Sequence, residues 1–268
     1  MHAVVRSSAL HQDRARHRSG GRLSTASCVR QVLPRTTLVA SAAAISLSFS
    51  VLQANAAKLG GAYFVDDAEI GKLGSCEFES WGSFADNTDR VLVFSPACVF
   101  NLGQPVELGA NFIKMRSDGA WDSTLALSAK TVPIPIKGDG LGLAVAGAVT
   151  YDLTTHTVNG LIVNVPVTWD ISKQLRFNVN MGAQYDLEQR ELFATLGTGI
   201  SWNFVQQWSW ISEIFAVVGP EQRNPRYQTG IRYNPSKDID LDMIYGRNLT
   251  GEGANWITLA VTARINDN

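Results

Sequence analysis

The segment from Lys173 to Leu187 alternates apolar and polar side chains, and this alternation constrains the fold more than any other feature of the chain. Its odd positions from 175 onward carry Leu, Phe, Val, Met, Ala, Tyr and Leu, whereas its even positions carry mostly Arg, Asn, Gln and Asp. Because successive residues of a β-strand point to opposite faces, the segment predicts a strand with one apolar and one polar face. The same alternation recurs along most of the chain and is typical of a transmembrane β-barrel.

Residues 1–56 have the features of an export signal, which does not belong to the mature fold. Seven arginines precede an apolar run from Leu38 to Leu52, and Ala54-Asn55-Ala56 forms a small-x-small cleavage site. Cleavage is therefore expected after Ala56. Two alternatives stay open, a transit peptide and a membrane anchor, although the 15-residue apolar run is shorter than the ~20 residues that span a bilayer.

The chain beyond residue 56 is acidic. It carries 16 basic and 23 acidic residues, a net charge of −7, because the signal contains seven of the 23 basic and one of the 24 acidic residues. Such a chain is a poor partner for nucleic acid, and it contains no apolar run long enough for a helical membrane span. The remaining 212 residues accommodate about twelve strands at roughly 10–15 residues per strand and turn.

Turn residues divide this part of the chain into its expected strands. The sequence predicts an all-β fold, a transmembrane antiparallel up-and-down β-barrel over residues 75–268, preceded by a periplasmic segment over 57–74. The expected strands are 75–84, 90–102, 105–116, 122–136, 140–153, 157–171, 173–187, 190–204, 207–219, 225–234, 237–247 and 255–266.

Aromatic residues provide an independent check, because membrane barrels place amphipathic rings on their outer face at both lipid–water interfaces. Two groups of rings have the outward parity of their strands. One group lies beside the expected periplasmic turns and the other at the opposite strand ends: Trp169, Trp202, Phe204, Trp208 and Trp210 form the first, and Tyr151, Tyr185, Tyr227 and Tyr245 the second. The alternative is a soluble sandwich with these rings in its core, but a sandwich does not predict this separation of Trp from Tyr.

An acidic segment that contains Gly and Lys leads into the first expected strand. Residues 66–74 read DDAEIGKLG and are followed by SCEFESW over 75–81. This opening resembles that of the outer-membrane proteins grouped as the phenol meta-pathway degradation family, in which a Glu-bearing first strand follows such a segment. The likeness covers roughly 16 residues, and the rest matches in architecture alone. The resemblance implies a transporter-like barrel for small solutes of aromatic or hydrophobic character.

Two cysteines beyond the signal are placed to form a disulfide, and the third, Cys28, lies within the signal. A hairpin turn at about Asn87-Thr88 sets Cys76 opposite Cys98. Directly opposed residues in an antiparallel pair approach the separation that a disulfide bridges, and the periplasm is oxidising. The expected disulfide is therefore Cys76–Cys98, and the alternative is two free thiols packed against lipid.

An outer-membrane enzyme is the main competing class, and it needs a nucleophile with a nearby base, or a metal cluster. The single histidine beyond residue 56 is His156, in an expected external turn, and it lacks the His/Ser pairing on one strand face that outer-membrane phospholipases present. The carboxylate pairs 77/79 and 240/242 are interpreted as lumen-lining charge. We therefore expect no enzymatic activity, no metal and no cofactor.

The polar strand faces predict a lumen of mixed charge. A sugar-acid porin would need a ladder of basic residues, which is absent, so strong anion selectivity is not expected. The inward residues of the strand at 140–153 are all small, so a channel would run off-centre along it, and the turn at 234–237 would set Arg232 opposite Asp240. The expected lumen-lining residues are Glu77, Glu79, Glu107, Lys130, Gly142, Ala144, Ala146, Ala148, Arg176, Asn178, Asn180, Glu213, Arg232, Asp240 and Asp242.

These patterns together predict a monomeric outer-membrane channel or facilitator for the passive passage of small solutes. About twelve strands leave at most a slender passage between a filled barrel and a wide porin. A structural barrel whose lumen is plugged by ion pairs is the open alternative, and an outer-membrane enzyme comes third. The expected partners are outer-membrane lipid, a small solute and the barrel assembly machinery.

Overall fold

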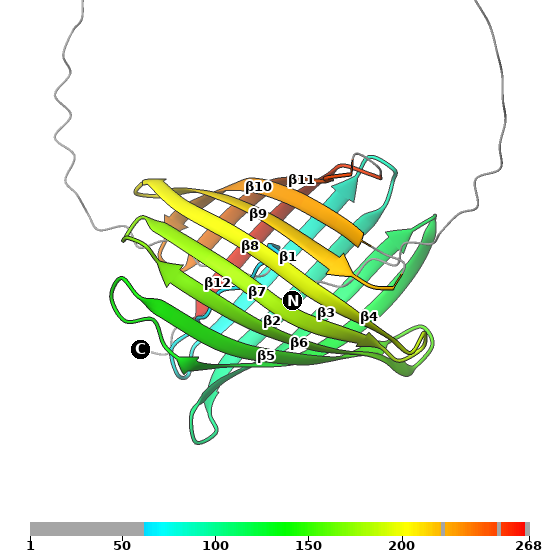
Figure 1. Ribbon diagram of the computed structural model, residues 1–268, viewed down its shortest axis with the longest axis horizontal. Coiled ribbons are helices and arrows are strands. Elements are labelled where there is room, and N and C mark those ends of the chain that lie inside the picture. Colours follow the sequence, from blue (N-terminus) through cyan, green and yellow to red (C-terminus); the bar gives the residue numbers. More distant parts are fainter. Residues whose placement is uncertain (1–61, 221–222, 251–252, 266–268) are drawn as a thin grey trace, which may run out of the picture. The chain divides into compact units, whose positions relative to one another are not determined.

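The computed structural model describes residues 62–220, 223–250 and 253–265, so the export signal predicted over 1–56 lies outside the described residues. Its strands run antiparallel and close into one barrel, in which β1 pairs with both β2 and β12 (Figure 1). The twelve strands are β1 (Cys76–Ala85), β2 (Arg90–Asn101), β3 (Pro105–Ser117), β4 (Ala120–Ile134), β5 (Leu141–Asp152), β6 (Thr157–Asp170), β7 (Leu175–Asp186), β8 (Glu191–Val205), β9 (Trp208–Val218), β10 (Arg223–Ser236), β11 (Ile239–Asn248) and β12 (Trp256–Ile265). The predicted barrel and its strands are confirmed.

The outward face of the barrel is apolar, as hydrocarbon requires, while its inner face is polar. On β7, Met181 points outward and is 54% exposed, whereas the inward Asn178 and Asn180 are buried. Exposed rings border the outer face at both strand ends, among them Trp169 and Tyr245. The period-two pattern of the sequence therefore fixes which side chains meet lipid.

Within the described ranges, no helix is long and apolar enough to cross a membrane.

The barrel has two ends, which differ in their turns. The terminal end holds the start of β1, the end of β12 and the turns that follow the even-numbered strands β2 to β10. The far end holds the turns that follow the odd-numbered strands. His156 lies in the far-end turn after β5 with a φ of 57°, and the Asp152 carboxylate accepts backbone N–H groups from Thr154 and Thr155 of the same turn.

The hairpin of β10 and β11 corrects one predicted pairing. Arg232 lies opposite Asp242, not Asp240, because the turn falls at residues 237–238 and the register shifts between Tyr233 and Ser236. Pro235 lies in this stretch and has no N–H to give to the ladder, which fits an irregularity there. The turn consequently comes later in the chain than the sequence suggested.

The predicted disulfide between Cys76 and Cys98 is confirmed. The two residues are direct partners in the ladder of β1 and β2, with their Cα atoms 4.0 Å apart and a sulfur–sulfur distance of 2.06 Å. The predicted hairpin register is therefore correct at this point.

Replacing both cysteines with Ser is expected to destabilise the barrel only modestly, on the order of 1–3 kcal/mol. The effect is small because β1 is already held by β12, and β2 by β3. Urea unfolding, followed by the heat-modifiable gel mobility of the folded barrel, measures the change. A double variant that never reaches the folded mobility would contradict this expectation.

Candidate solute chamber

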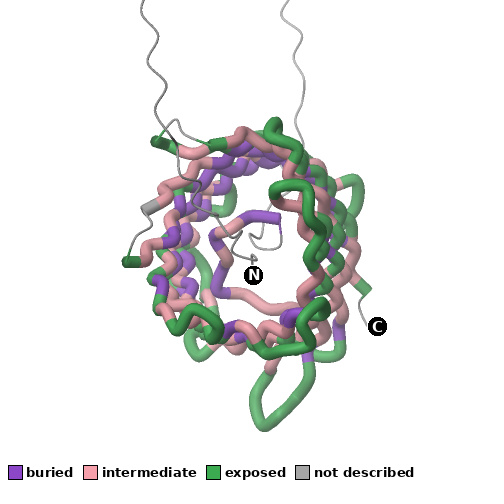
Figure 2. Tube along the Cα trace, turned by 90° about the vertical axis from the view of Figure 1, so that its right-hand side faces the viewer, coloured by how far each residue is buried: buried purple, intermediate pink, exposed green. Residues whose placement is uncertain are grey.

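Residues 62–72, called the lumen segment from here on, lie inside the barrel (Figure 2). The sequence prediction of a periplasmic segment over 57–74 did not anticipate this position. The N–H of Ala62 donates to Glu79 at 2.8 Å, and the N–H of Ala68 donates to Thr168 at 2.7 Å. The segment thus connects β1 with β6, on separate parts of the wall.

The first residues of the lumen segment are held by apolar packing and by one carboxylate. Tyr63 and Val65 have no exposed surface, and the ring of Phe64 stacks on Phe215 with centroids 4.3 Å apart. The Glu213 carboxylate accepts the N–H groups of Phe64 and Val65 at 2.6 and 2.9 Å. These bonds satisfy backbone donors that the segment would otherwise bury unpaired.

Glycines on the wall make room for this packing. A Cβ built at Gly197 would lie 2.8 Å from a methyl carbon of Val65, and one at Gly230 would lie 2.7 Å from the Tyr63 hydroxyl oxygen. Larger side chains at these two positions would collide with the segment. The two glycines therefore let the inner faces of β8 and β10 fit the segment closely.

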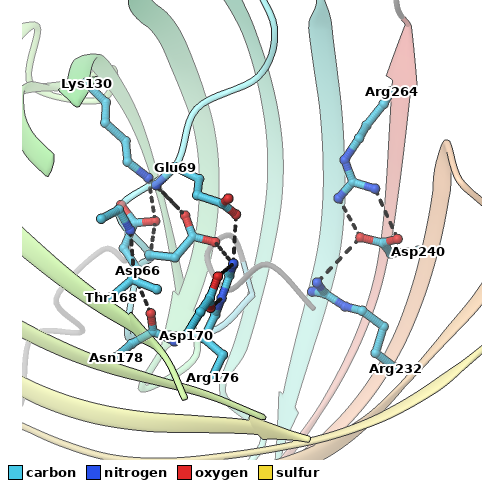
Figure 3. Close-up of polar contacts among 12 residues, drawn as sticks. Asp66, Glu69, Lys130, Thr168, Asp170, Arg176, Asn178, Arg232, Asp240 and Arg264 are labelled. Carbon is cyan, nitrogen blue, oxygen red and sulfur yellow. Dashed lines mark hydrogen bonds and ion pairs between the residues drawn. The ribbon is translucent and has the colours of Figure 1, made fainter. Parts of the chain in front are cut away.

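The acidic residues of the segment enter an ion-pair cluster with the wall (Figure 3). Lys130 on β4 lies 2.8 Å from Asp66 and 3.6 Å from Asp67. Arg176 on β7 lies 2.7 Å from Glu69 and also holds Asp170 of β6, with two bonds of 2.6 and 3.0 Å. This segment cluster joins the lumen segment to three strands through partly buried charges.

A second cluster is formed by the strands alone. Arg232 binds Asp242 in a bidentate pair at 2.8 and 3.0 Å and lies 3.4 Å from Asp240. Arg264 on β12 binds Asp240 at 2.5 Å and Glu77 on β1 at 2.7 Å. All ion pairs of this strand cluster join residues of β1 and β10 to β12, and Arg232 also lies over the ring of Tyr63, 5.6 Å from its centroid.

A chamber of about 1160 Å³ opens beside the segment at the terminal end of the barrel. Residues of the turns after β4, β6, β8 and β10 form its mouth, and the lumen segment lines it over residues 64–72 except Val65 and Ala68. Its lining includes ten acidic and seven basic residues, so the acidic excess is three. The lining of the chamber is therefore polar and carries more carboxylates than cationic side chains.

The predicted lumen-lining residues divide into two groups in the structure. Those that line the chamber are Glu77, Glu79, Glu107, Lys130, Ala146, Arg176, Arg232 and Asp240. Those that do not line it are Gly142, Ala144, Ala148, Asn178, Asn180, Glu213 and Asp242, and all of these are buried.

The small inward face of β5 contributes less to the chamber than its sequence suggested. Ala146 lines the chamber, but Ala144 is fully buried. A Cβ at Gly142 would lie 2.4 Å from the side chain of Ile136, which occupies the space that the glycine leaves. The turn after β4 thus fills part of the expected strip.

The acidic members of the lumen segment were not among the predicted lumen residues. Asp66, Asp67 and Glu69 all line the chamber. A signal for their position exists in the sequence, because the apolar run of Tyr63 to Val65 directly precedes them and needs burial. Within the described ranges, no group of His, Cys, Asp and Glu residues could hold a metal ion.

Several solved structures are similar to this barrel. The KdgM porin is 9% identical with a TM-score of 0.56, and the match covers 71% of this chain and 99% of that chain. The NanC porin is 11% identical with a TM-score of 0.53, covering 70% of this chain and 100% of that one. The COG4313 outer membrane channel from Pseudomonas putida F1 is 11% identical with a TM-score of 0.53, covering 74% and 98%.

At these identities the likeness defines the fold, which is that of bacterial outer-membrane porins and channels. The chain belongs to the family described as "Uncharacterised conserved protein UCP029691", whose model matches residues 47–265. No curated protein sequence matches it significantly. These comparisons support the porin-like class but not the phenol meta-pathway family in particular.

Proposed function

We propose that this chain is an outer-membrane channel for the passive passage of small polar solutes, with a preference for cations. The observation that carries the proposal is the chamber, which is open at the terminal end and lined by an excess of carboxylates. A low-dielectric wall concentrates the field of such charges and raises the local concentration of cations. The apolar outer face supplies the contact with outer-membrane lipid.

The same lining limits the class of solute. The sequence resemblance implied aromatic or hydrophobic solutes, and these suit a charged lining only when they also carry a positive charge. An aromatic amine combines both properties. The proposal further includes cleavage of the export signal after Ala56 and insertion by the barrel assembly machinery.

Liposome swelling tests this function with solutes of matched size. Proteoliposomes containing the purified mature chain should swell faster in a small amine salt than in a neutral sugar, and slowest in a carboxylate such as gluconate. The order follows from the acidic excess of the chamber. Equal rates for all three solutes, at the level of empty liposomes, would count against a channel.

A structural barrel with a plugged lumen is the second candidate. The observation that favours it is the lumen segment, whose Tyr63 and Val65 are fully buried in the barrel interior. A plugged barrel would give no swelling above empty liposomes for any solute. The two candidates therefore differ in the swelling experiment itself.

A further inference from the structure

We propose that the lumen segment is a displaceable plug, and that when it moves Lys130 pairs with Glu107 while Arg176 keeps Asp170. This inference rests on the channel function proposed above, because it describes how that channel opens. The segment has two parts with different contacts. Residues 62–65 form an apolar anchor, and residues 66–69 form an acidic latch.

The anchor is buried, whereas the latch borders solvent. Tyr63 and Val65 have no exposed surface. The side chains of Asp66 and Glu69 are 23% and 29% exposed in the chamber, while that of Asp67 is only 3% exposed. Ions in the chamber therefore reach Asp66 and Glu69 of the latch directly, whereas Phe64 is the residue of the anchor that lines the chamber. The latch is the part of the segment that a change of charge affects first.

The wall offers a carboxylate to each of the two cations that the latch holds. Glu107 is the direct cross-strand partner of Lys130 in the ladder of β3 and β4, and side chains so placed are close enough to pair. Asp170 already holds Arg176 with two bonds of 2.6 and 3.0 Å. When the latch leaves, both cations retain a carboxylate on the wall. Displacement therefore exposes no uncompensated buried cation, which would be costly.

Glu107 also has a role in the present arrangement, in which it accepts the N–H of Gly71 at 3.4 Å. This is a long and weak bond. If the Glu107 side chain turned from Gly71 to Lys130, it would exchange this weak bond for an ion pair. The segment cluster thus has two sets of partners, whereas each cation of the strand cluster is held by strand carboxylates in either state.

The experiment fixes the anchor to the wall by a reversible disulfide. The double variant is Val65→Cys, Gly197→Cys. Because a Cβ at Gly197 would lie 2.8 Å from a methyl carbon of Val65, the two Cβ atoms of the variant lie within about 4.5 Å of each other, a separation that a disulfide bridges. The variant is recorded in planar bilayers, first oxidised and then with dithiothreitol. The parent is reduced in parallel, to control for its own Cys76–Cys98 bond.

We expect the oxidised variant to open at least tenfold less often than the reduced one, while the parent is unchanged by the reductant. If the oxidised and reduced variants open equally often, the segment need not move and the inference is wrong. If the parent, the variant and a chain lacking residues 62–71 are all silent, the channel function fails and the inference falls with it. The deleted chain thus separates the two failures. If it conducts, only the plug inference can be wrong, and if it is silent with the others, the channel function itself fails.

Charge variants test the exchange of partners separately. Neutralising the latch with Asp66→Asn, Asp67→Asn and Glu69→Gln should raise the open fraction severalfold, because Lys130 and Arg176 release it. Neutralising the wall with Glu107→Gln and Asp170→Asn should lower the open fraction, because the cations then depend on the latch. The measured quantity is the fraction of time that the channel is open. The size of the conductance step is not used, because a change in the charge of the lining alters it even when the segment does not move.

A matched control removes the same number of charges away from the segment. The exposed far-end residues suit this purpose, in the triple variant Asp118→Asn, Asp122→Asn and Glu188→Gln. It should keep the parental open fraction. Latch and wall variants that both behave like this control would overturn the exchange of partners, even when the disulfide experiment succeeds.

Discussion

A chain in which Met replaces Arg232 is expected to be about 3–5 kcal/mol less stable than the parent, a larger loss than removal of the disulfide should cause. The Arg232 side chain is 5% exposed and lies between Asp242, which has no exposed side chain, and Asp240, which is 4% exposed. Removing the cation leaves the Asp242 carboxylate buried without its bidentate partner, close in the chain to Asp240, which keeps Arg264. Such uncompensated buried charge costs more than the lost contacts alone.

The loss is measured as the shift of the urea midpoint at which the barrel leaves its fast-migrating folded form. The double variant Arg232→Met, Asp242→Asn serves as control, because it removes the charge that the substitution leaves unpaired. It should recover a large part of the stability. A single variant as stable as the parent would show that water screens this cluster far better than its burial indicates.

Deleting residues 62–71 is expected to raise the single-channel conductance severalfold. The deletion removes the ring of Phe64 from Phe215 and the buried Tyr63 and Val65 from the barrel interior. It also removes three of the ten acidic residues of the chamber lining, so the preference for cations should fall while the conductance rises. Conductance and reversal potential are recorded together in a gradient of potassium chloride.

Two further experiments test whether a change in conductance results from misfolding of the deleted chain. The deleted chain must show heat-modifiable gel mobility, since Glu79 and Glu213 both lose their backbone donors. A chain with Glu213→Gln and an intact segment provides a comparison, because its single amide oxygen can accept only one of the two N–H groups that the carboxylate oxygens accept from Phe64 and Val65. A folded deletion variant with the parental conductance would mean that the segment does not limit the passage.

The fold was predictable because the lipid imposes a simple rule on each strand. The alternation of apolar and polar residues in the segment that forms β7 predicted that Met181 points outward and Asn178 inward, and the structure agrees. The disulfide was predictable for the same reason, since a short hairpin fixes which residues of β1 and β2 face each other. Local rules were sufficient in both cases.

The parts that could not be predicted depend on contacts between distant residues. The alternation rule says which way a side chain points but not what it meets, so Glu213 was placed inward without its partners, Phe64 and Val65. The register of β10 and β11 was missed because an irregularity near Pro235 interrupts the count from the turn. The filling of β5 by Ile136 likewise depends on how the turn after β4 bends into the lumen.

Single-channel recording of the purified mature chain in a gradient of potassium chloride tests the central claim most directly. The chamber and its carboxylate excess predict discrete conductance steps and a reversal potential whose sign corresponds to selectivity for potassium over chloride. A reversal potential on the chloride side, or the absence of steps both in the parent and in the chain lacking residues 62–71, would contradict a cation-preferring channel.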